Sequence, residues 1–185
     1  MKVTLRMLSV LCVLSSGAFL VSGCGYTLAG RGSSLPTTIK TIGIPMFINR
    51  TTVFNLETTL TQKVRAEFIG RGKYEIVPSA NNVDGLLTGE VTSVSIVPSA
   101  FNAAQLASRY AITMTARVEL RNTRDDMVLW DNPSLVFRQE YEATGNQSST
   151  GAVDPTTFFG QDTNALDRMS TEFARSIVSA ILEAF

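Results

Sequence analysis

The most informative absence in this 185-residue chain is histidine, of which it has none. Without an imidazole there is no Ser-His-Asp triad, no histidine base and no histidine metal ligand. Lysine and arginine together number 16, as do aspartate and glutamate, which argues against a strongly basic face for nucleic acid. The chain also lacks a phosphate-cradling glycine motif and a paired acid and base. It therefore predicts no enzyme, no cofactor and no metal site.

The first 23 residues have the layout of an export signal. Lys2 and Arg6 precede an uncharged, mostly apolar stretch over residues 7–21, and small residues then lead to Cys24. The apolar stretch is shorter than the roughly 20 residues of a membrane-spanning helix and contains Ser15, Ser16 and Gly17. The ending Val-Ser-Gly-Cys resembles the lipobox of bacterial lipoproteins, in which the cysteine is acylated and becomes the first mature residue. A plain secretory signal or an uncleaved anchor is the alternative.

Cysteine is then missing from the mature domain. Cys12 leaves with the signal, and Cys24 is the predicted lipid-attachment residue. Several acyl chains on one residue give stable attachment to a membrane. The following Gly25 resembles the pattern of lipoproteins sorted to the outer membrane. A domain of about 160 residues without disulfides buries about 70% of its unfolded surface, so its core is large enough to hold it together.

The start of the mature chain changes from a tether to an ordered domain. Residues 24–38 are rich in glycine and serine and have no hydrophobic period, which is typical of a tether. Residues 39–185 predict a single domain. A strand is expected over residues 39–48, and a helix within residues 51–72, because four apolar residues recur there at every fourth position: Leu56, Leu60, Val64 and Phe68.

The middle of the domain predicts strands. Residues 73–77 form a short strand candidate, and residues 85–97 form a longer one whose apolar face switches near Ser93, as at a β-bulge. Residues 98–108 are expected to be a loop. Residues 109–121 alternate strictly, with one apolar face made of Tyr110, Ile112, Met114, Ala116, Val118 and Leu120.

The last third predicts a returning strand, a long loop and a helix. The strand runs from Met127 to the Glu-Ala at 142–143 and is interrupted at Pro133. Residues 143–161 are expected to be irregular. A helix capped by Asp162 or Thr163 follows, with an apolar stripe of Leu166, Met169, Phe173, Ile177 and Ile181.

Two helices with one apolar stripe each need a sheet to cover. The predicted fold class is α+β, a two-layer sandwich. It has a mixed, mostly antiparallel sheet of about four strands with two helices packed on one face.

Four segments in this order carry a resemblance to a known family. They are CGYTL at 24–28, SLPTTIKTIGIPMFINRT at 34–51, LLTGEV at 86–91 and RYAITMTARVELRNTRDDMVLWDNP at 109–133. Together they resemble the LPS-assembly lipoproteins (LptE-like) over essentially the whole mature chain. The resemblance implies a lipid-anchored protein on the periplasmic face of the outer membrane. Such proteins plug a β-barrel LPS translocon, assist its assembly, contact lipopolysaccharide and are not enzymes.

The residues for lipopolysaccharide contact do not carry over by position. The family's basic loops correspond here to residues 98–108 and 143–161, neither of which contains lysine or arginine. The nearest candidates are strand arginines, because guanidinium groups match phosphate oxygens: Arg109, Arg117, Arg121 and Arg138. The alternative is that these are solvated strand arginines near Glu119 and Glu140, because opposite charges often pair in sheets.

Two other functions are less well supported. A lipoprotein that regulates a cell-wall synthase needs a long tether, whereas this one has a mean reach of about 20 Å. A periplasmic hydrolase needs a convergent site that the sequence lacks. Phe101, Phe158 and Phe159 lie in predicted loops, where they are either contacts to a barrel wall or to lipid, or minor core residues.

Overall fold

The computed structural model describes residues 35–142 and 151–185. The predicted signal peptide and residues 24–34 of the tether, Cys24 included, lie outside the described residues. The elements follow in the order β1 (Thr41–Gly43), β2 (Ile48–Asn49), α2 (Leu56–Gly70), β3 (Glu75–Val77), β4 (Gly85–Phe101), β5 (Ala107–Asn122), β6 (Val128–Glu142), α3 (Pro155–Gln161) and α4 (Thr163–Glu183). None of these helices is both long and apolar enough to cross a membrane.

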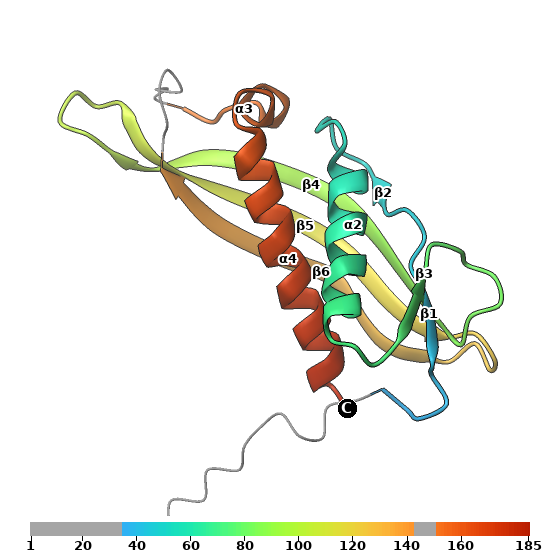
Figure 1. Ribbon diagram of the computed structural model, residues 1–185. Coiled ribbons are helices and arrows are strands. Elements are labelled where there is room, and N and C mark those ends of the chain that lie inside the picture. Colours follow the sequence, from blue (N-terminus) through green and yellow to red (C-terminus); the bar gives the residue numbers. More distant parts are fainter. Residues whose placement is uncertain (1–34, 143–150) are drawn as a thin grey trace, which may run out of the picture. The chain divides into compact units, whose positions relative to one another are not determined.

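The strands form one mixed sheet in the order β3-β1-β4-β5-β6, and β2 also pairs with β4. β1, β2 and β3 join it in parallel, whereas β4, β5 and β6 form an antiparallel meander. Figure 1 shows α2 and α4 side by side across one face of this sheet. The predicted α+β class is confirmed. The expected number of about four strands is wrong, because the described sheet has six.

The extra strand arises where one strand was expected over residues 39–48. Pro45 has no N–H to give to a ladder, and it separates β1 from β2. The Ile44 carbonyl at this break accepts hydrogen bonds from the Arg65 side chain at 2.8 and 2.6 Å. Each short strand then joins a different stretch of β4.

Both long helices bury the stripes that the sequence predicts. In α2 the four residues of the stripe are fully buried, and in α4 the same holds for Met169, Phe173, Ile177 and Ile181. Leu166 lies at the edge of the core. The first helix begins later than expected, after Asn55 instead of Thr51 or Thr52. The last begins as expected, because the Asp162 carboxylate accepts a hydrogen bond from the Ala165 N–H at 2.9 Å.

The long strands keep the predicted alternation and extend further than expected. All six residues of the apolar face of β5 are buried, and β4 has a bulge between Val91 and Ser93. The expected loop over residues 98–108 is wrong at both ends, because β4 continues to Phe101 and β5 begins at Ala107. Likewise β6 passes through Pro133 with a shift in register and no break.

A short helix, α3, lies in the region that was expected to be irregular. Asp154 caps it by accepting a hydrogen bond from the Thr157 N–H at 3.0 Å, and a proline occupies its first position. Aspartate followed by proline is a signal for a helix start, and it stands in the sequence. Phe158 and Phe159 are buried, so of their two predicted roles the core is the one observed.

One glycine determines how β2 and the segment before it reach the sheet. Phe47 is buried with its ring over Gly89, where a Cβ atom would come within 2.6 Å of the ring carbons. The buried Thr61 hydroxyl accepts a hydrogen bond from the Phe47 N–H at 2.9 Å and donates one to the Glu57 carbonyl at 2.6 Å. Phe47, in the connection between β1 and β2, therefore contacts both β4 of the sheet and the helix α2.

We predict that Gly89→Ala lowers the free energy of unfolding by about 1–3 kcal/mol, because the added methyl group forces Phe47 out of its place. Gly70→Ala is the matched control, since nothing lies within 4 Å of a Cβ atom at that position. Urea denaturation measures both. Equal midpoints for the two variants would contradict this account of Gly89.

A second set of polar contacts, centred on Asp84, joins the start of β1 to the turn between β5 and β6. The Asp84 carboxylate accepts hydrogen bonds from the N–H groups of Lys40 and Thr41 at 3.0 and 3.1 Å. Its other oxygen lies 2.5 Å from the Arg124 guanidinium. These backbone hydrogen bonds, followed by the bond to Arg124, lower the pKa of Asp84 from 3.8 to about 2.

Stability should therefore depend on pH through Asp84. In acid the unfolded chain binds the proton before the folded one does. The stabilisation is complete above the unfolded pKa of 3.8 and is lost as the pH falls to about 2. We expect Asp84→Asn to be less stable than the parent near neutral pH, with the difference shrinking across that window. Unfolding free energies measured from neutral pH down to about pH 2 test this. Asp131→Asn, on the exposed face of β6, is the control, and an unchanged difference would contradict the prediction.

Candidate functional site

The face of the β4–β5–β6 meander opposite the helices is mainly polar, apart from the exposed Val128 and Val136, and it carries the four candidate arginines. β5 exposes the odd-numbered side of its alternation, so Arg117 and Arg121 share one face, as the sequence predicts. The register places Arg117 opposite Glu90, Arg138 opposite Thr113 and Arg109 opposite Glu142. We call this surface the outer face. Among the described helices, those that pack on the sheet lie on its other side (Figure 1).

Two of the candidate arginines are engaged within the fold. The Arg121 guanidinium forms ion pairs with Glu119 at 2.7 Å and Asp126 at 3.0 Å. The hydrogen bonds that Arg121 donates to Glu119 and then Asp126 raise the pKa of Arg121 further above its usual value. Arg109 lies 4.0 Å from Glu140, at the limit of an ion pair. Arg121 therefore secures the β5–β6 turn, which agrees with the structural alternative for this residue.

The other two arginines are more available. Arg117 and Arg138 are exposed, and within the described ranges neither forms an ion pair. Glu90, which lies opposite Arg117, is instead bound by Arg50 at 2.8 Å. Arg117 and Arg138 lie about 13 Å apart along the strands. They therefore present two separate positive charges along this broad surface.

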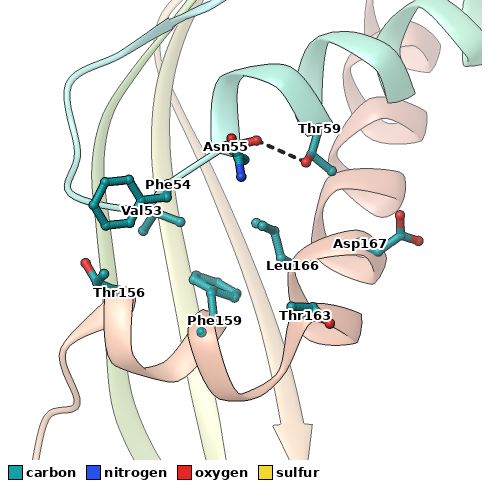
Figure 2. Close-up of a pocket in the computed structure, with 10 residues that line it drawn as sticks. Val53, Phe54, Asn55, Thr59, Thr156, Phe159, Thr163, Leu166 and Asp167 are labelled. Atoms are coloured by element: carbon teal, nitrogen blue, oxygen red, sulfur yellow. Dashed lines mark hydrogen bonds between the residues drawn. The ribbon is translucent and has the colours of Figure 1, made fainter.

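A pocket of about 380 Å³ opens between the start of α2, the helix α3 and the first turns of α4. Figure 2 shows Phe159 and Leu166 turned toward its interior, with Val53 and Phe54 opposite and Asn55 above them. Asp167 points away from the interior and pairs with Lys63 at 2.6 Å. The lining is mainly apolar, with threonines at the rim: Thr59, Thr156 and Thr163.

The pocket is held open by backbone geometry and short polar contacts. Asn55 has left-handed backbone angles, with φ at 59°, and its side chain does not cap α2. Its carbonyl accepts a hydrogen bond from the Thr59 hydroxyl at 3.0 Å, drawn in Figure 2. The Thr156 hydroxyl binds the Thr52 carbonyl at 3.0 Å and so joins α3 to the chain before α2. The apolar side chains that line the pocket suit the binding of an apolar group.

A third feature was not predicted from the sequence. The Arg168 guanidinium lies 5.0 Å from the centre of the Tyr141 ring, at a hollow of about 610 Å³ between β6 and α4. Burial raises the pKa of Tyr141 to about 12, against the opposing effect of Arg168. The Tyr141 hydroxyl is buried without a hydrogen-bond partner among the described residues. Only the packing of α4 beside β6 brings these side chains together, so no local pattern indicates the pair.

The described residues offer no site for a metal ion. Across residues 35–142 and 151–185, no three or more aspartates, glutamates or cysteines gather closely enough to hold one. The candidate surfaces are therefore the outer face with Arg117 and Arg138, and the apolar pocket. The predicted lipid attachment at Cys24 lies outside the described residues.

Comparison with known proteins identifies a family and the fold. Residues 39–181 match the family LptE, lipopolysaccharide-assembly. The hypothetical protein CT253 from Chlamydia trachomatis is similar in structure, with a TM-score of 0.51 at 11% identity over 77% of this chain and 95% of that one. At that identity the likeness shows the fold alone. No curated protein sequence matches the chain significantly.

Two further structures superpose less closely. Rare lipoprotein B from Shewanella oneidensis has a TM-score of 0.47 at 13% identity, over 77% of this chain and 93% of that one. A PelC dodecamer from Paraburkholderia phytofirmans also has a TM-score of 0.47, at 12% identity over 80% of this chain and 90% of that one.

Proposed function

The chain belongs to the lipopolysaccharide-assembly (LptE) family, and from this premise we propose that it plugs a β-barrel translocon in the outer membrane. In this role it is a lipid-anchored protein on the periplasmic face, not an enzyme. It assists assembly of the barrel and the transport and insertion of lipopolysaccharide. Its partners are the barrel, lipopolysaccharide and the membrane.

The observation that carries the plug proposal is the one-sided fold. The helices cover the inner face of the meander. The outer face remains a broad, mainly polar surface with two arginines that form no ion pair among the described residues. The interior of a large membrane barrel is also polar. A protein that fills such an interior needs a rigid polar surface whose side chains can pair with the barrel wall. The outer face supplies this, because its backbone groups are already bonded within the sheet.

Co-purification tests the proposal and the outer face together. A C-terminally tagged chain, extracted from outer membranes in mild detergent, should bring down a stoichiometric β-barrel of translocon size and lipopolysaccharide. Arg117→Glu combined with Arg138→Glu should reduce the barrel yield at least about tenfold, because two interface charges are reversed. Both residues are exposed, so folding should not change.

Lys40→Glu combined with Arg175→Glu is the control with the same change in charge. Lys40 precedes β1 and Arg175 lies on α4, both away from the outer face. Equal barrel yields for the two double variants would remove the outer face from the interface. A sample without any barrel, or with a cell-wall synthase in its place, would overturn the plug proposal itself.

The two cysteines provide a matched test of the lipid anchor. We expect Cys24→Ser to abolish incorporation of labelled palmitate and to leave the chain unattached to membranes, because the lipobox sulfur is lost. Cys12→Ser should be labelled and attached like the parent, since this cysteine lies within the predicted signal. Labelling that follows Cys12, or persists in Cys24→Ser, would contradict the predicted attachment residue.

A further inference from the structure

The β4–β5 hairpin ends in a segment with unusual composition. Residues 93–108 contain no charged side chain. The segment that follows β6 along the chain touches β4 through a bridge between Val153 and Ile96. Beyond this bridge the hairpin continues past the helices, as Figure 1 shows. We call residues 97–107 the hairpin tip.

The hairpin tip exposes large apolar side chains that the core does not need. Phe101 is 55% exposed, Val97 is 38% exposed and Leu106 is 37% exposed. The alanines at 103 and 104 between them are exposed as well. A cluster of exposed apolar residues at the end of a projecting element is typical of a surface that meets an apolar partner.

The turn at the hairpin tip bonds its own polar backbone groups. The N–H groups of Asn102 and Gln105 donate to the carbonyls of Leu106 and Asn102, at 2.9 Å each. The side-chain oxygen of Asn102 accepts from the N–H groups of Ala104 at 2.9 Å and Leu106 at 3.0 Å. Unbonded backbone groups oppose transfer into hydrocarbon, so this arrangement removes much of the barrier to leaving water.

The opposite end of the sheet provides a contrast. In the β5–β6 turn too, an asparagine side chain accepts a backbone hydrogen bond: Asn122 accepts one from the Arg124 N–H at 3.0 Å. That turn, however, carries Arg124, Asp125 and Asp126. Its exposed Met127 thus lies among charges, whereas Phe101 does not. Both ends expose apolar side chains, but only the hairpin tip does so without charged residues beside them.

Charged residues begin just below the hairpin tip, and they balance. Arg109 lies opposite Glu142, and Arg138 and Glu140 stand on the adjoining stretch of β6. These two positive and two negative side chains give the surface beside the hairpin tip no net charge. The surface therefore lacks the positive field that would select an anionic headgroup. It suits contact with hydrocarbon beneath a zwitterionic surface.

We propose that the hairpin tip inserts Phe101 and Leu106 into the hydrocarbon of a phospholipid bilayer, as a second membrane contact besides the lipid anchor. The contact is made by the protein before a barrel encloses it, so it goes beyond the plug function and does not depend on it. A few apolar side chains bind a bilayer weakly alone. Tethering raises their effective concentration at the surface.

Tryptophan placed at either end of the meander tests this. The full chain is reconstituted in phosphatidylcholine vesicles, without a barrel, as Phe101→Trp and as Met127→Trp. Trp130 in the parent gives the baseline. Insertion should shift the emission added by Phe101→Trp to the blue, and lipids brominated on their acyl chains should quench roughly half of it. The emission added by Met127→Trp should change little in either respect. Both positions are exposed, and Leu106→Trp is a second probe.

Three outcomes would overturn the proposal. One is equal quenching at positions 101 and 127, and another is quenching at 101 only when lipopolysaccharide replaces phosphatidylcholine. The third is quenching at 101 only after a barrel is added, which would assign the hairpin tip to the translocon. Each is distinguishable from failure of the plug proposal, because that proposal is tested by co-purification of a barrel and not by quenching in vesicles.

Discussion

Burial of one face of the meander by α2 and α4 is the constraint on which the rest of the structure depends. Every second side chain of β5 from Tyr110 to Leu120 enters this layer, and the stripes of both helices close it. The alternation of a strand then sends the remaining side chains to the opposite face. That face has no described helix to cover it, so it is polar, and it is where the exposed arginines lie. Core and candidate interface thus result from one pattern.

Much of this fold could be predicted from the sequence, because its main elements carry strong periods. The stripes of α2 and α4, the alternation of β5 and the bulge near Ser93 are set by side chains close together in the chain, and the structure confirms them. The α+β class follows because each predicted helix has one apolar stripe that must pack against the apolar face of a sheet. The LptE resemblance, based on ordered segments, is confirmed by the family match over residues 39–181.

The remaining features depend on tertiary contacts or on very short elements. β2 has two residues and acquires its identity only beside β4, so no period could indicate it. The capping signal of α3 was present at Asp154, but its seven residues were too few for a stripe. The arginines show the same limit. The sequence places Arg117 and Arg121 on one face of the strand. Only the fold of the β5–β6 turn brings Asp126 to Arg121, so that Arg121 is held in an ion pair and Arg117 stays available.

The position of β1 has a consequence for how the chain folds. β1 lies between β3 and β4 in the sheet, and both of these strands follow it in the sequence. The second of them, β4, begins at Gly85. The meander, by contrast, joins neighbours in sequence and closes only short loops. Local contacts form faster than distant ones. We therefore expect the meander to nucleate folding and β1 to dock late, so that a chain made from its N-terminus holds β1 unpaired until the strands of the meander have followed.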